Sequence, residues 1–157
     1  RDAGWLYQEA IAWVKSAAVW SVPRSMHIEN GHYFPALRWE IILVMSRGSH
    51  PRFEMNDKDL VRQFDENVWN IPVVAGNTQD KLGHPAIFPL EIPHRLCLAY
   101  TMKGSLVLDP FIGSGTTMVA AETLGRICYG MDISPAYVAV TLQRMADMGL
   151  EPKKVSG

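Results

Sequence analysis

The residues best suited to chemistry lie in one short stretch, VLDPFIGSGTT, at positions 107–117. It is typical of a strand, a tight turn and the start of a helix, because Gly113 and Gly115 permit a close backbone turn after the apolar run that ends at Asp109. The amino end of such a helix offers N–H groups and a partial positive charge to a carboxylate or phosphate. Further along, Asp132 ends the next predicted strand, where a carboxylate can accept hydrogen bonds from ribose hydroxyls. The pattern predicts a nucleoside-cofactor site.

The turn departs from the common nucleotide motifs. Met118 stands where the third glycine of G-x-G-x-x-G would be, and the lysine of a P-loop is missing. Asp109 would repel a pyrophosphate but would suit the ammonium of an amino-acid moiety, and Thr116 and Thr117 add hydroxyls in the first helical turn. These residues favour S-adenosylmethionine, whose methionine end carries an ammonium and a carboxylate, over NAD.

The secondary structure around these side chains is predicted most clearly in the C-terminal part. Apolar runs predict strands at 105–109 and 126–132, and each is followed by a predicted helix, at 116–125 and 134–149. Ser134 is the expected N-cap of the last helix and Pro135 its first residue. Strand and helix alternating at this spacing predict a parallel βα unit with a right-handed crossover, and so an α/β fold.

The preceding sequence is less regular. The spacing predicts a short helix to about Glu9, a strand over Ala10–Lys15 and a buried strand over Ile41–Met45. The polar region 47–68 is expected to be a loop or insertion, with a short helix near Asp57–Phe64. A short extended segment should follow at 68–74, and a further helix should run from Leu90 until Gly104 ends it.

Composition limits the class of protein. A chain of 157 residues with 48% hydrophobic and 20% charged residues suits one globular domain. The net charge of −1 excludes a chain that grips nucleic acid by bulk charge alone. No apolar run reaches membrane-spanning length, so we expect no membrane partner. Cys97 and Cys128 lack metal-ligand spacing, the histidines form no zinc-like cluster, and a cytoplasmic protein with free thiols and no metal is expected.

The motifs also carry a resemblance to a known family. DPFIGSGTT followed by YGMDISPAYV resembles the cofactor-binding region of DNA amino-methyltransferases, which modify the exocyclic amine of adenine or cytosine. HPAIFPLEIPHRL is similar to the family's other cofactor segment, and GWLYQEAIAWVKS and RWEIILVMSRG resemble the strands that follow its catalytic motif. The order is that of the family's beta arrangement. The resemblance covers most of the chain and is weakest over residues 47–68.

The resemblance implies a Rossmann-like fold of S-adenosylmethionine-dependent methyltransferases, with a mostly parallel sheet flanked by helices, incomplete in this chain. A single methyltransferase domain would span 1–157, and its cofactor-binding region would span 84–148. The partner would be double-stranded DNA.

Site residues follow from the same resemblance. Asp109 would hold the methionine amino group, Thr116 and Thr117 would meet the carboxylate, and Asp132 would take the ribose hydroxyls, with Ile133 against the adenine. Other positions would shape the pocket: Phe111, Gly113 and Gly115 in the turn, and His84, Pro85, Ala86 and Phe88 on the opposite side.

One family motif is missing. The reaction depends on an Asp/Asn/Ser-Pro-Pro-aromatic motif that polarises the target amine and stacks on a flipped-out base. The chain has 10 prolines and no Pro-Pro dipeptide, so it contains no predicted catalytic residue. In the beta arrangement the motif would precede Arg1. We therefore expect the C-terminal part of a longer methyltransferase, inactive alone, that forms a homodimer or is complemented by an N-terminal catalytic part.

Several alternatives stay open. The chain could be a non-catalytic S-adenosylmethionine-binding subunit of a split methyltransferase, or an NAD-binding oxidoreductase domain. The residues do not distinguish adenine from cytosine, because that choice depends largely on the missing motif. They also do not reveal the recognised DNA site, or separate a restriction-modification role from a regulatory or phage role.

Overall fold

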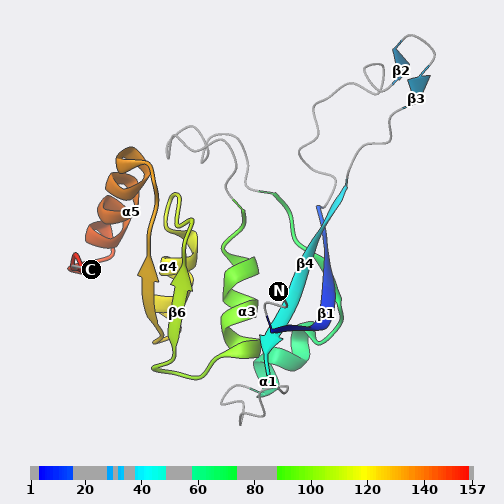
Figure 1. The fold of residues 1–157 in the computed structure, drawn as a ribbon, viewed down its shortest axis with the longest axis horizontal. Coiled ribbons are helices and arrows are strands. Elements are labelled where there is room, and N and C mark those ends of the chain that lie inside the picture. Colours follow the sequence, from blue (N-terminus) through cyan, green and yellow to red (C-terminus); the bar gives the residue numbers. More distant parts are fainter. Residues whose placement is uncertain are drawn as a thin grey trace. The chain divides into compact units, whose positions relative to one another are not determined.

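The chain folds into two compact units, shown in a computed structural model (Figure 1). The first comprises Arg1–Glu54 and Arg62–Val73, and the second comprises Met55–Val61 and Val74–Gly157. The structure describes residues 4–15, 38–48, 58–73 and 88–155, together with two short strands at 28–29 and 32–33.

The first unit is built on a three-stranded sheet with the order β4-β1-β5. β1 (Trp5–Val14) pairs antiparallel with β4 (Trp39–Arg47) and parallel with β5 (Val68–Asn70). The described residues of this unit also form a 3₁₀ helix, η3 (Arg62–Phe64), and an antiparallel pair of two-residue strands, β2 (Ile28–Glu29) and β3 (His32–Tyr33).

One face of this sheet carries the core of the unit. Ile11, Trp13, Trp69 and Ile71 are buried. The Trp13 indole N–H donates to the Ile71 carbonyl at 2.7 Å, which ties β1 to the chain beyond β5. The strand over 41–45 was predicted to be buried, and this is wrong for the side chains on the sheet face opposite the core. Three of its side chains lie there about half exposed, because alternate residues point away from the core: Ile41, Leu43 and Met45.

The predicted helix up to Glu9 is also wrong, because β1 is a strand from Trp5 onward. Its pairing with β4 shifts register between Tyr7 and Glu9, so Gln8 is an extra residue. A bulge of this kind interrupts the two-residue alternation that identifies a strand. The Gln8 amide donates to the Ser46 hydroxyl on β4 at 2.7 Å, which anchors the bulge.

The second unit contains the predicted βα unit. β6 (Leu106–Asp109) and β7 (Ile127–Gly130) pair in parallel, which confirms the prediction. α4 (Thr116–Thr123) connects them and packs against β7, and α5 (Pro135–Asp147) follows β7 (Figure 1). Two further helices lie in the part of this unit that the structure describes, α1 (Lys58–Val61) and α3 (Glu91–Tyr100).

The core of the second unit lies between its helices and the β6-β7 pair. Ala120 and Ala121 are fully buried on α4, where their small side chains allow α3 to approach. Cys97 and Leu98 supply the facing side of α3. Arg126, only 3% exposed, lies at the end of this core.

The helix predicted from Leu90 is confirmed as α3, but it ends at Tyr100, so the predicted stop at Gly104 is wrong. Thr101 is extended, and the Arg126 guanidinium donates to its carbonyl at 2.8 Å and its hydroxyl at 3.0 Å. The same guanidinium donates to the Leu124 carbonyl near the end of α4 at 2.7 Å. The end of α3 is therefore set by a tertiary contact, because Arg126 takes up carbonyls that a helix end leaves unpaired.

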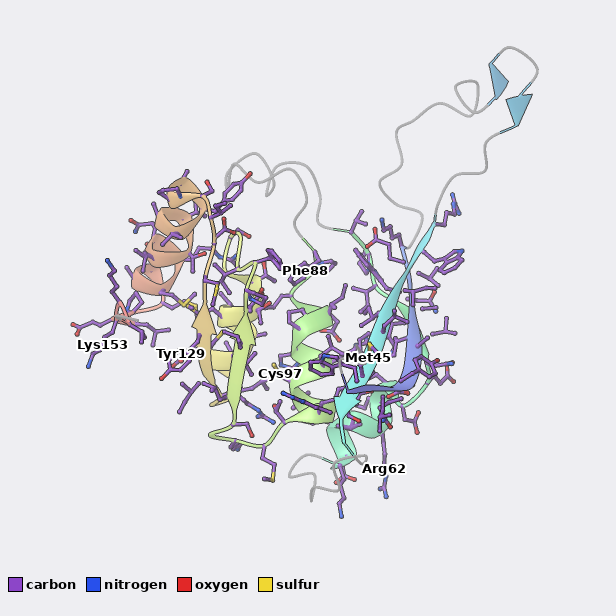
Figure 2. The ribbon with its side chains drawn as sticks, viewed as in Figure 1. Met45, Arg62, Phe88, Cys97, Tyr129 and Lys153 are labelled. Atoms are coloured by element: carbon purple, nitrogen blue, oxygen red, sulfur yellow. The ribbon has the colours of Figure 1, made fainter. Side chains whose placement is uncertain are left out.

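The outer face of the β6-β7 pair is apolar and open. Leu106 and Leu108 are 59% and 60% exposed, and they lie opposite Ile127 and Tyr129, which are also exposed. Figure 2 shows the Tyr129 side chain on β7. The expected burial of the strand at 105–109 is thus wrong on this face, because α4 packs on the other one. None of the helices in the described part of the chain has the length and apolar character of a membrane span.

Candidate cofactor site

Two carboxylates meet at one edge of the β6-β7 pair. Asp109 is the last residue of β6 and lies opposite Gly130, the last residue of β7, so Asp132 follows two residues beyond the same edge. The Met131 amide donates to the Asp109 carbonyl at 3.0 Å, and the Ile112 amide donates to the Met131 carbonyl at 2.9 Å. These bonds hold the turn after β6 against the end of β7.

The glycines of the turn are required by its geometry. Gly115 has φ +81°, and a Cβ atom there would lie 2.8 Å from Thr141 Cγ2 on α5. Gly130 faces the turn from β7, and a Cβ atom there would lie 2.7 Å from Ile112 Cγ1. Gly113 also has a positive φ, of 52°. Glycine is therefore needed both for left-handed backbone and for close approach.

Asp132 braces the turn and the start of α5 together. One carboxylate oxygen accepts from the Gly113 amide at 3.0 Å, and the other accepts from the Ser134 amide at 2.8 Å. Ser134 itself is the predicted N-cap, although its own side chain makes no cap hydrogen bond. Because each carboxylate oxygen can accept more than one hydrogen bond, Asp132 keeps the capacity to accept from a ligand.

Asp109 is half-buried and shapes the first part of the turn. Its Oδ1 accepts from the Phe111 amide at 2.9 Å. Its negative charge also acts on the thiol of Cys128 on β7. Burial first, and the charge of Asp109 second, raise the pKa of the Cys128 thiol to about 11.

The start of α4 suits a small anion. Gly115 stands at the N-cap position of α4 and has no side chain with which to cap the helix. Thr116 is buried, at 5% exposed, and Thr117 is half-buried. The amides of the first turn and the helix dipole therefore favour a carboxylate or phosphate here.

Two large apolar side chains beside the turn are almost wholly exposed. Phe111 is 83% exposed and Ile133 is at the fully exposed limit, so either could cover one face of a planar ligand. Phe88 is 37% exposed and precedes α3 (Figure 2). The other residues expected on the opposite wall lie outside the described part of the chain: His84, Pro85 and Ala86.

A cavity of about 650 Å³ lies next to this site but does not include the two carboxylates. Leu108, Met131 and Leu142 are among its lining residues, and Pro152–Val155 border it. Since neither Asp109 nor Asp132 lines it, we assign the candidate site to the open rim at the strand ends. Among the described residues, no group of three or more His, Cys, Asp or Glu could hold a metal ion.

Polar contacts from α5 were missed by the sequence analysis. The Thr141 hydroxyl donates to the Gly113 carbonyl at 2.9 Å, and Arg144 Nη1 donates to the Ser114 carbonyl at 2.6 Å. The sequence does contain a signal for Thr141. It lies at helical spacing between Val138 and Met145, on the face of α5 that is turned inward. A polar residue in such a stripe needs a buried partner.

This chain belongs to the N6_N4_Mtase family of DNA methylases, whose model matches residues 1–143. Among its relatives, the Type II methyltransferase M.SmaI of Serratia marcescens is 28% identical over 85% of this chain and 46% of its own length. The Type II methyltransferase M.Cfr9I of Citrobacter freundii is 30% identical over 88% of this chain and 46% of its own. The chain therefore spans about half the length of these curated relatives.

Solved structures agree with this fold. A putative DNA modification methylase of Thermus thermophilus, complexed with S-adenosyl-L-methionine, matches with a TM-score of 0.66 and 27% identity. That match covers 92% of this chain and 54% of the other. The cytosine-N4-specific PvuII DNA methyltransferase matches with a TM-score of 0.65 at 23% identity, over 87% of this chain and 50% of the other, which shows the fold alone. The Rossmann-like methyltransferase fold predicted from the sequence is thereby confirmed.

Proposed function

We propose that this chain forms the cofactor-binding part of an S-adenosylmethionine-dependent DNA methyltransferase that acts on the exocyclic amine of adenine or cytosine. The observation that carries the proposal is the meeting of Asp109 and Asp132 beside a glycine turn that leads into α4 with Gly115 at its N-cap. Membership of the DNA methylase family supports it, as does the S-adenosyl-L-methionine complex of the Thermus relative.

The predicted site residues that the structure describes each have a role in this proposal. Asp109 accepts a hydrogen bond from the ammonium of the cofactor's methionine moiety. The start of α4, with Thr116 and Thr117, binds the carboxylate of the same moiety. Asp132 accepts from the ribose hydroxyls while it continues to brace the turn. Ile133 packs on the adenine. When bound, the cofactor supplies an activated methyl group on its sulfonium, and the protein keeps that group in one orientation.

Phe111, Gly113 and Gly115 shape the turn in this proposal, and Phe88 closes the other side of the pocket. The remaining wall is proposed from the sequence alone, since it lies outside the described residues: His84, Pro85 and Ala86.

Calorimetric titration with S-adenosylhomocysteine tests the cofactor, with NAD as the competing ligand. We expect saturable binding of the first and none of NAD. Asp132→Ala should weaken binding at least tenfold, and Asp132→Asn should weaken it less, because the amide retains one oxygen acceptor. Asp147→Ala is the matched control, since its carboxylate on α5 accepts from the exposed Gln143 amide.

Failure would be clear in this titration. The proposed cofactor would be overturned if the chain is folded by circular dichroism and yet does not bind S-adenosylhomocysteine, or binds NAD instead. Equal weakening by Asp147→Ala would show that the effect of Asp132 is not local to the site.

We also propose that a separate catalytic part, which carries the Pro-Pro-aromatic motif, completes the enzyme. The open apolar face formed by Leu106, Leu108, Ile127 and Tyr129 supports this, because sheets of this class are covered on both faces. A second copy of the chain is the alternative cover. Light scattering should show a dimer, or a complex when the catalytic part is added, and a monodisperse monomer in both cases would contradict the proposal.

Methyl transfer tests the division of labour. The purified chain, given labelled S-adenosylmethionine and double-stranded DNA, should transfer no label. Addition of the catalytic part should restore transfer to adenine or cytosine. Transfer by the 157-residue chain alone would contradict the need for a second part.

A further inference from the structure

α5 reaches the glycine turn through two polar side chains, Thr141 and Arg144, one helical turn apart. Thr141 is 4% exposed, and its hydroxyl donates to the Gly113 carbonyl at 2.9 Å. Arg144 Nη1 donates to the Ser114 carbonyl at 2.6 Å and lies 3.5 Å from the Thr116 hydroxyl oxygen. Residues at i and i+3 share one face of a helix, so a single face of α5 holds two successive carbonyls of the turn.

These contacts determine which way the turn's peptide groups face. In a trans peptide the carbonyl and the following N–H point in opposite directions. Holding the Gly113 carbonyl toward α5 therefore directs the Ser114 N–H away from α5. On the other side of Gly113, its own N–H donates to Asp132. Gly113 is thus held from both its amide and its carbonyl.

Arg144 also places a positive charge behind the start of α4. Arg144 donates to oxygens of neutral groups, namely the Ser114 carbonyl and hydroxyl and the Thr116 hydroxyl. Burial lowers the pKa of this guanidinium, which stays protonated all the same because an arginine ordinarily titrates far above neutral pH. The charge and the helix dipole act in the same direction on an anion bound at the turn.

We propose that Thr141 and Arg144 are positioning residues of the cofactor site, which hold the carbonyls of Gly113 and Ser114 so that the turn is set before the ligand binds. The inference rests on the proposed function for the identity of that ligand. Neither residue needs to touch the cofactor. Their contribution is preorganisation, because a turn already in its bound shape loses less entropy on binding.

Four substitutions and one control test this on the whole chain. Thr141→Val keeps the shape but removes the hydroxyl, and Arg144→Met removes the donor. We expect each to raise the dissociation constant for S-adenosylhomocysteine about tenfold, which corresponds to about 1.4 kcal/mol. Thr141→Ser and Arg144→Lys should recover most of the affinity. Gln143→Ala, on the same helix with an exposed partner, should change nothing.

Hydrogen exchange provides a readout that general destabilisation would not reproduce. In Thr141→Val and Arg144→Met the Gly115 amide, which donates to the Ile112 carbonyl at 2.8 Å, should exchange about tenfold faster. Exchange at Leu98 on α3 should stay unchanged. Faster exchange throughout the chain would indicate a merely structural role and would overturn the inference.

The outcomes separate the two proposals. If the unaltered chain binds S-adenosylhomocysteine and both variants bind within twofold of it, the positioning inference is overturned and the cofactor stands. If the unaltered chain does not bind, the proposed function is lost, and amide exchange alone decides the inference. Local acceleration at Gly115 would then support positioning of the turn, and unchanged exchange would overturn it.

Discussion

The N-terminal sheet and the glycine turn hold their shapes by different means. The sheet is held by strand pairing and by the packing of large apolar side chains. Trp13 and Trp69 fill the core, and Phe64 packs edge to face on Trp69 with ring centroids 6.0 Å apart. In the turn, single hydrogen bonds dominate, because Asp132 and Thr141 each hold one backbone group of Gly113.

That contrast explains what each region can tolerate. A sheet core accepts many apolar residues of suitable volume, because dispersion and burial are summed over many contacts. A turn held by a few directed bonds depends on individual atoms. Substitutions in the turn should therefore affect both binding and stability, and those in the sheet should affect stability alone.

The largest expected effect comes from Gly115→Ala. It combines a left-handed backbone, at about 1–2 kcal/mol, with overpacking against Thr141, at about 1–3 kcal/mol. Gly125→Ala is the matched control, because Gly125 has φ +70° but open space around its Cβ position. Urea unfolding should show a loss of about 3 kcal/mol for the first and about 1 kcal/mol for the second. S-adenosylhomocysteine binding should be lost only in Gly115→Ala.

Equal losses of stability in the two alanine variants would contradict this prediction. They would show that the backbone conformation alone matters and that the approach of α5 to the turn does not. The turn would then not differ from the sheet in its sensitivity to single atoms.

A smaller effect is expected from Trp13→Phe in the sheet. The change removes the N–H that donates to the Ile71 carbonyl and leaves a buried carbonyl without that partner, at about 2 kcal/mol. Trp5→Phe, on the same strand but 56% exposed, should cost less than about 0.5 kcal/mol. Urea unfolding followed by circular dichroism measures both. Cofactor affinity should be unchanged in both, and a drop of more than twofold in Trp13→Phe would show that sheet and turn are coupled.

The smallest effect concerns the pH dependence of Cys128. Its folded-state pKa of about 11 lies above the ordinary value of 9.0, so the folded chain holds the thiol proton more tightly. This stabilisation is fully present below about pH 9 and is lost as the pH rises towards 11. Alkylation at pH 8, followed by mass spectrometry, should be about a hundredfold slower at Cys128 in the folded chain than in urea, because two pKa units reduce the thiolate about a hundredfold. Equal rates would refute the shift.

Local signals predicted the second unit well. Ser134 and Pro135 marked the start of α5, and the apolar runs on either side of α4 marked two strands that do pair in parallel. The short helix expected over 57–64 is also confirmed in outline, as α1 and η3. These signals work because caps, turns and periodicity act within a few residues of chain.

The failures share a physical cause. The helix predicted up to Glu9 is wrong because β1 has a bulge at Gln8, which interrupts the strand alternation and is bonded across the sheet to Ser46. The end of α3 was misplaced because Arg126, distant in sequence, bonds to the carbonyl of Thr101. Apolar runs were expected to be buried on both faces, whereas the described structure covers one.

Local sequence patterns were enough to predict the order of strand, turn, helix and strand and the positions of Asp109 and Asp132. They also carried the resemblance to a methyltransferase family, which the family model confirms. The contacts that hold the turn could not be predicted in this way, because they come from α5. Thr141 and Arg144 bond to residues 28 and 30 positions earlier in the chain. No local rule pairs residues so far apart, because their meeting depends on the packing of α5 against the turn.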